Sequence, residues 1–222
     1  PDTEYPMTDS ESPNASEELI QFFLPHLTQH IEMTTILFSR AEKKDLAEAD
    51  WLLILNEKQS GKFLKHHYLS QSWDEVNSFH NRTFTDARKR VLDMSEEDLL
   101  ADIVRTDGSK RKVWQQLTGH ALSHMTSHFS VVYCRIGKDD QATQLEEKTA
   151  ILLRGLDESP EWRGIIQYNL ACHYTLIKQS SRAVALLKQA IALSPSLKER
   201  SAKDPNLEPI RENTENKALY GA

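Results

Sequence analysis

The sequence predicts an all-α fold. Glycine is scarce, at 7 of 222 residues, and the apolar/polar alternation typical of strands is hard to find. Nearly every segment instead has apolar residues three and four apart, a spacing that places them on one face of a helix. Helix-start signals such as Ser72-Trp-Asp-Glu and helix-stop signals such as Gly137 separate these segments. We therefore expect several helices joined by short loops.

The N-terminal part is expected to form an arm followed by two helices. Residues 1–15 are polar and rich in Pro, Ser, Asp and Glu, which predicts a flexible arm. A first helix is predicted over 16–40, where Pro25 should kink it or begin its second part. A second helical segment is predicted over 43–57. The apolar stripe of the first helix contains Leu19, Phe23, Leu27 and Leu37.

The middle of the chain carries clear capping signals. A third helix is predicted to open at Ser72, where Ser72-Trp-Asp-Glu has the form of a capping box. Ser95-Glu-Glu-Asp starts another short helical turn, and Asp107-Gly-Ser breaks it. Lys110-Arg-Lys is interpreted as the surface of a helix start, followed by a strong helix over 112–136. The inward row of the third helix is predicted to be Val76, Thr83, Ala87 and Val91.

The C-terminal part is predicted to hold an internal repeat. Helices are expected over 141–156, 162–178, 181–193 and 196–202, followed by a polar tail over 204–222. The segment from Leu152 to Pro160 aligns with the segment from Leu187 to Pro195, 35 positions later. A period near 34 residues is typical of stacked helix pairs.

Charge and cysteine content exclude several classes of protein. The net charge is −6 and no basic run is interleaved with aromatic residues, so we expect no nucleic-acid or membrane partner. No stretch approaches the roughly 20 apolar residues of a membrane span, and the first residues lack the features of a signal peptide. Cys134 and Cys172 do not predict a disulfide framework. These observations predict a soluble, cytoplasmic protein.

The most informative motif is a row of histidines in the strong helix. His120, His124 and His128 are four residues apart, and two inward imidazoles one turn apart can bind a divalent metal. A third ligand must come from another helix. Candidates are His30 near the centre of the first helix's stripe, His26 on its border and His80 in the third helix. Alternatively, each histidine is an ordinary core or boundary residue that forms hydrogen bonds.

The run His-Ala-Leu-Ser-His-Met-Thr-Ser-His resembles the last core helix of the DinB superfamily, and Leu24-Pro-His-Leu-Thr resembles the helix that carries its first metal histidine. By that match His26 joins His124 and His128 as a metal ligand. The segment from Ser72 to Leu99 is similar to the ClbS/DfsB branch, which commonly lacks the complete triad. The resemblance spans about residues 16–137 and implies a four-helix bundle over 16–138.

The DinB resemblance also implies a function. The superfamily has a pocket at the end of the bundle, with or without metal, that acts on small molecules by hydrolysis, thiol transfer or detoxification. A Zn, Ni or Fe ion on the three histidines would hold an activated water or thiolate. Glu32 and Asp86 are candidate bases, and their spacing does not select one. Whether the chain is an enzyme stays open.

The C-terminal helices resemble a tetratricopeptide repeat over residues 164–195, and we assign 139–203 to this segment. The resemblance implies either a groove that binds a peptide or protein partner, or a cap that covers one side of the bundle. A metal-free scaffold or interaction module is therefore the alternative function, and exposed helix faces could also pair in a homodimer. The resemblance depends on Leu170, Ala171, Tyr174, Ala183, Leu187, Ala190 and Pro195.

Overall fold

A computed structural model describes residues 72–104 and 110–211. These residues are mostly helical, which confirms the all-α prediction at that level. They belong to two compact units, one holding 72–104 and 110–125 and the other 126–211. The predicted arm and the helices over 16–40 and 43–57 lie outside the described residues. None of the described helices has both the length and the apolar character that a membrane crossing requires.

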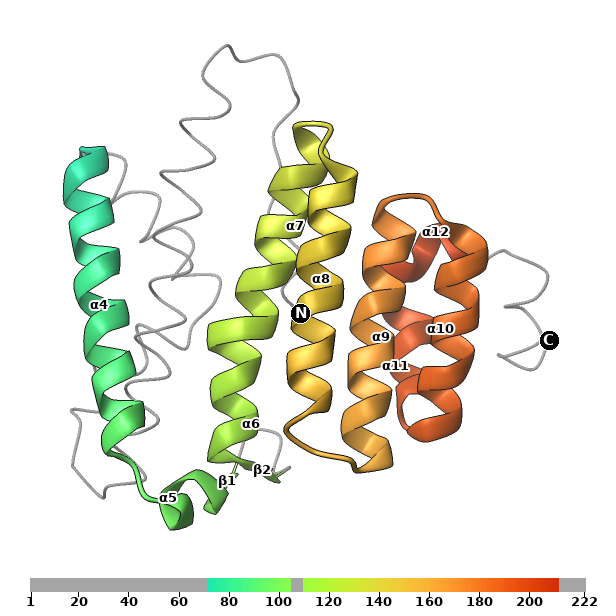
Figure 1. The fold of residues 1–222 in the computed structure, drawn as a ribbon. Helices are drawn as coiled ribbons and strands as arrows, with labels where there is room; N and C mark the ends of the chain where they lie inside the picture. The colour runs from blue at the N-terminus through green and yellow to red at the C-terminus, as the bar shows by residue number, and fades with distance from the viewer. Residues whose placement is uncertain (1–71, 105–109, 212–222) are drawn as a thin grey trace. The chain divides into compact units, whose positions relative to one another are not determined.

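Helix α4 (Trp73–Asp93) begins where the capping signal predicts (Figure 1). The Ser72 hydroxyl accepts a hydrogen bond from the backbone N–H of Glu75 at 3.3 Å. The Glu75 carboxylate accepts one from the backbone N–H of Ser72 at 2.7 Å. This reciprocal pair satisfies two backbone donors that the first turn of a helix leaves open. The predicted inward row is largely confirmed, because Val76 and Ala87 are buried.

A short helix and a strand pair follow. Helix α5 (Glu96–Leu100) has a second capping box, formed by Ser95 and Asp98. Strand β1 (Asp102–Val104) then pairs antiparallel with β2 (Lys110–Lys112), with Ile103 opposite Arg111. This pair was not predicted from the sequence, and the interpretation of Lys110-Arg-Lys as a helix start was wrong by three residues. Strands of three residues are too short to show a period of two.

The predicted helix over 112–136 is interrupted by a different kind of helix. Helix α6 (Val113–Thr118) leads into a π-helical turn, η1 (Gly119–His124), and α7 (Met125–Arg135) follows without a break in the helical assignment. The helix then ends just before Gly137, which the sequence predicts as a helix stop. Gly137 has φ +71°, in the left-handed region that glycine occupies at little cost.

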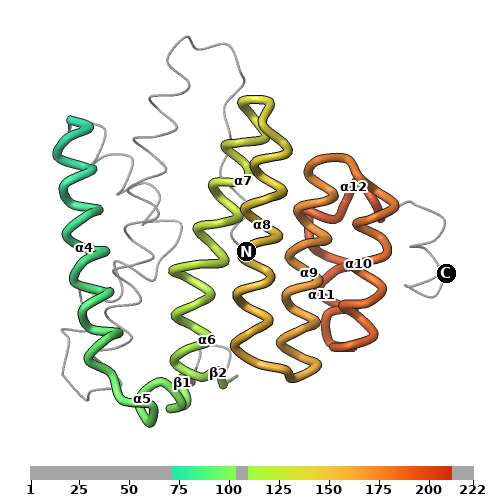
Figure 2. The backbone as a smooth tube through the Cα atoms, in the orientation of Figure 1, coloured from blue at the N-terminus to red at the C-terminus, as the bar shows by residue number. Residues whose placement is uncertain are grey.

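The unit of residues 126–211 is a row of helices. Helices α7, α8 (Asp139–Arg154), α9 (Pro160–Leu176) and α10 (Ser180–Leu193) lie side by side (Figures 1 and 2). The helices predicted over 141–156, 162–178 and 181–193 are thus observed, with ends shifted by up to two residues. Ser159 caps α9 by accepting the backbone N–H of Trp162, and Pro160 occupies the first turn.

Small residues let α9 and α10 approach each other closely. Ala171, Ala183 and Ala190 are completely buried, and Leu187 fills the space between them. The approach is close at Gly164, because a Cβ atom added there would lie 2.9 Å from Ser194 Cβ and 3.1 Å from the Ala190 carbonyl oxygen. The core of this unit is therefore centred on the α9–α10 pair.

The end of the described chain packs into this core. Helix α11 (Leu197–Lys203) agrees with the predicted short helix, and the turn η2 (Pro205–Leu207) and helix α12 (Glu208–Arg211) follow. Leu207 and Ile210 are each only 1% exposed. The prediction of a patternless polar tail was therefore wrong for residues 205–211, because two buried apolar side chains anchor this segment.

Candidate functional site

The structure places part of the predicted histidine site. His120 and His124 lie in η1 and His128 lies in α7, and all three side chains are partly buried. The ring Nε2 of His120 pairs with the amide Nε2 of Gln116, one turn earlier in α6. The proposed third ligand His26 and its alternative His30 lie outside the described residues, as does Glu32.

The π-helical turn changes the spacing between the first two histidines of the row. A π-helix bonds residue i to i+5 instead of i+4, so residues four apart in it no longer lie one directly above the other. This affects His120 and His124, which both belong to η1. From Met125 onward the α-helical pattern returns. His120 is therefore less suited than the sequence implied to act together with His124.

Helix α4 carries two further predicted candidates, His80 and Asp86. His80 is half-buried, stacks on Phe84 with ring centroids 6.4 Å apart, and has a pKa lowered by burial. Asp86, a candidate base, is exposed on the same helix. Within residues 72–104 and 110–211, no three His, Cys, Asp or Glu side chains are grouped as a metal ion would require.

A second set of buried polar residues lies between α7 and α8 and was not predicted. The hydroxyls of Thr126 and Thr149 form a hydrogen bond at 2.9 Å across the two helices. Nearby, Glu146 of α8 is 7% exposed and Ser130 of α7 is 1% exposed. Burial raises the pKa of Glu146 to about 7, although the Ser130 hydroxyl offsets part of this rise. The burial of this carboxyl could not be predicted from the sequence, because glutamate in a helix is usually solvated.

A buried histidine lies on α9. His173 Nε2 is 3.0 Å from the Thr143 hydroxyl of α8, and its ring packs edge-on against Tyr174 with centroids 5.3 Å apart. Its Nδ1 has no hydrogen-bond partner in the described part of the chain. Burial, the largest cause, lowers the pKa of His173, whereas Glu147 raises it in part. The ring is therefore held mainly in its neutral form.

Glu147 joins three helices at the surface. Its Oε1 accepts a hydrogen bond from the Tyr174 hydroxyl of α9 at 2.6 Å and another from Arg182 of α10 at 2.7 Å. The Arg182 guanidinium also lies 4.1 Å from the centroid of the Tyr174 ring. We interpret Glu147, Tyr174 and Arg182 as a structural clamp, because the polar groups of these residues form their hydrogen bonds with one another.

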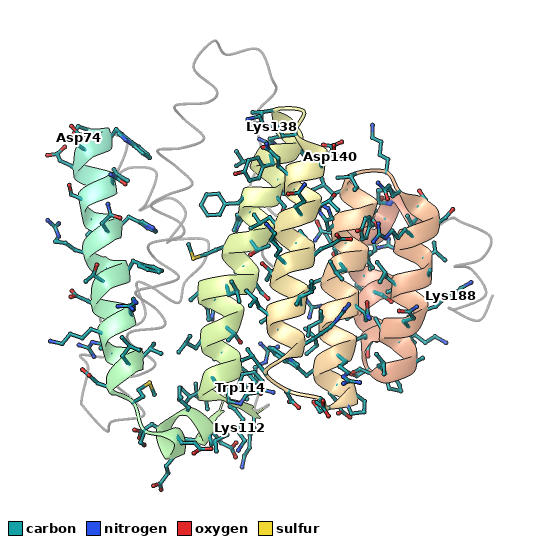
Figure 3. The ribbon with its side chains drawn as sticks, viewed as in Figure 1. Asp74, Lys112, Trp114, Lys138, Asp140 and Lys188 are labelled. Carbon is teal, nitrogen blue, oxygen red and sulfur yellow. The ribbon has the colours of Figure 1, made fainter. Side chains whose placement is uncertain are left out.

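Neither cysteine has the properties of a nucleophile. Cys134 and Cys172 are both unpaired thiols. Burial is the largest cause that raises the pKa of Cys134 to about 11, and it also raises that of Cys172. A reactive cysteine needs a lowered pKa. In the other unit, Lys112 of β2 forms an ion pair with Asp102 of β1 at 2.7 Å, close to the start of α6, where Figure 3 labels Lys112 and Trp114.

Comparisons with known proteins complete these observations. No family model, no curated protein and no solved structure matches this chain. The functional argument therefore rests on the residues and their geometry.

Proposed function

We propose that the protein binds a divalent metal ion through His124, His128 and His26 and acts on a small molecule at that site. The observation that carries this proposal is the π-helical turn of residues 119–124. Such turns are rare, interrupt an otherwise regular helix and occur frequently at functional sites. Here the turn ends at His124, and α7 with His128 follows directly.

The chemistry of the donors supports the same proposal. Three imidazoles are a common ligand set for zinc, and imidazole also suits nickel and iron. His124 and His128 would supply two such ligands, so the proposal requires a third. The DinB resemblance assigns the role of third ligand to His26, and His30 and His80 are the alternatives. When bound, such an ion polarises a carbonyl or lowers the pKa of a water molecule.

Metal analysis of the untagged full-length protein tests this proposal. We expect near-stoichiometric Zn, Ni or Fe, lost in the double variant His124→Ala, His128→Ala and in either His26→Ala or His30→Ala. His80→Ala is the control and should retain the metal, because the DinB resemblance assigns the third ligand to His26 and not to His80. Circular dichroism of each variant verifies that the helices remain folded. A metal-free wild-type protein whose Tm does not change on adding these metals would contradict the proposal.

A second candidate function is a metal-free interaction module built on the C-terminal helices. The observation that favours it is a group of exposed apolar side chains at the end of α8, where Ile151, Leu152 and Leu156 are 65%, 62% and 52% exposed. Contiguous exposed apolar surface often marks a site for a protein partner. The metal analysis separates the two candidates, because only the first requires a bound ion.

A further inference from the structure

Glu146 lies in the middle of a polar contact between α7 and α8. On α7, Thr126, Ser130 and Cys134 are four residues apart and therefore share one face. Glu146 and Thr149 lie on the facing side of α8, where the Thr126–Thr149 hydrogen bond fixes how the two helices meet. The contact thus consists of small polar side chains around one buried carboxyl group.

The buried carboxyl has no positive partner among the described residues. The arginine on neighbouring α10, Arg182, pairs with Glu147 and not with Glu146. The titratable groups that face Glu146 are the thiols of Cys134 on α7 and Cys172 on α9, whose raised pKa values keep both neutral at physiological pH. His173 of α9 is not affected by Glu146, because the charges that shift the pKa of His173 are those of Glu147, Asp139 and Arg182.

Hydrogen bonding offsets little of the free-energy cost of burying an ionised Glu146 carboxylate. The Ser130 hydroxyl is buried and makes no hydrogen bond of normal geometry, although it lies close enough to Glu146 to favour the ionised carboxylate in part. An unpaired charge in such a place is costly, whereas the protonated carboxyl is tolerated and can donate a hydrogen bond. The α7–α8 contact is therefore more favourable when the Glu146 carboxyl is protonated than when it is ionised.

We propose that Glu146 is a proton-controlled latch that holds α7 against α8 when the carboxyl is protonated and loosens this contact when it ionises. The α9–α10 pair does not take part, because its core consists of apolar and small side chains such as Ala171, Ala183 and Leu187. The latch does not depend on the metal proposal, since it uses none of the three proposed ligands.

The direction and size of the effect follow from the pKa of Glu146. The closed contact raises this pKa from 4.5 to about 7, so the closed form binds the proton more tightly than a solvated carboxyl does. Protonation of Glu146 therefore stabilises the closed α7–α8 contact. This stabilisation is complete below pH 4.5, decreases as the pH rises towards 7, and is lost above pH 7, where the closing equilibrium no longer changes with pH. Over that range the closing equilibrium should change on the order of 100-fold.

Hydrogen exchange of the full-length protein tests the latch. Protection factors, which correct for the intrinsic effect of pH on exchange, are measured by mass spectrometry for the peptides of α7 and α10 between pH 4.5 and 8. In the wild type we expect protection of α7 to fall with rising pH and then level off, while that of α10 stays constant. In Glu146→Gln, which keeps the shape of the side chain without its charge, α7 should stay protected throughout.

Two further variants make the result decisive. In Ser130→Ala the pKa of Glu146 should rise, so the loss of α7 protection should extend to higher pH. Glu158→Gln removes an exposed carboxylate and should behave as the wild type. Equal pH dependence in wild type and Glu146→Gln would overturn the latch. Parallel changes in α7 and α10 would also overturn it, because they would indicate an effect on the whole unit.

Discussion

Replacing Gly164 with alanine should weaken the contact between α9 and α10. The new Cβ atom would lie 2.9 Å from Ser194 Cβ, 3.1 Å from the Ala190 carbonyl oxygen and 3.4 Å from Leu193 Cβ. None of these atoms is the end of a flexible side chain, so the two helices must separate or shift to accept the methyl group. The substitution thus acts at a close approach of α9 and α10 within the core of this unit.

Two opposing free energies determine the size of the effect. Alanine is favoured over glycine in a helix interior by about 1 kcal/mol. Forcing an extra carbon into a well-packed core costs typically about 1–3 kcal/mol. Because the contacts at Gly164 involve backbone and Cβ atoms, we expect the upper part of that range and a net destabilisation of about 1–2 kcal/mol.

Urea denaturation followed by tryptophan fluorescence measures this change. Trp162 is 7% exposed, lies in α9 and donates its indole N–H to the Leu153 carbonyl oxygen at 2.7 Å, so it reports on the affected unit. A parallel thermal melt should show a decrease in Tm of roughly 4–8 °C for each kcal/mol lost by a unit of this size.

Gly155→Ala is the matched control for this experiment. Gly155 has ordinary right-handed helical geometry at the end of α8, and a Cβ atom there would meet only the Leu152 carbonyl oxygen at 3.4 Å, an ordinary van der Waals distance. Its stability should stay within about 0.5 kcal/mol of the wild type. If Gly164→Ala proved as stable as the wild type or more stable, the close packing inferred for α9 and α10 would be refuted.

Two further predictions concern the polar contacts of the same unit. Tyr174→Phe should cost about 1 kcal/mol, because the partly exposed Glu147 carboxylate loses the hydrogen bond that the Tyr174 hydroxyl donates. A double-mutant cycle with Arg182→Gln should give a coupling of roughly 0.5–1 kcal/mol, and additive effects would show that the clamp does not act as a unit. Burial lowers the pKa of His173 from its usual value of 6.5, so the stability that the neutral ring contributes is present above pH 6.5 and is lost as the pH falls below that value. The urea midpoint of the wild type should therefore fall more steeply below pH 6.5 than that of His173→Gln. Parallel curves for the two proteins would contradict this prediction.

Much of the secondary structure could be predicted because its signals are local. Ser72 with Glu75 and Ser95 with Asp98 are capping boxes in which each residue needs only a partner three positions away. Gly137 ends its helix because its own backbone adopts a positive φ. The start of α9 was predicted to within two residues for the same reason, because Ser159 and Pro160 mark it locally.

The candidate site could be predicted only in part. The spacing of His120, His124 and His128 is visible in the sequence, but the π-helical turn that alters it is not, because an i to i+5 bonding pattern leaves no distinct period in the residues. The third ligand, His26, lies outside the described residues and stays a prediction.

The sequence by itself determined which segments are helical and where several of them begin and end. The tertiary structure decided which side chains lie between the helices. Only packing places Glu146 out of contact with water, and only packing buries Leu207 and Ile210 in a segment that looks polar. The physical reason is that helix formation depends on neighbours along the chain, whereas burial and the pKa shifts it causes depend on residues that are distant in sequence.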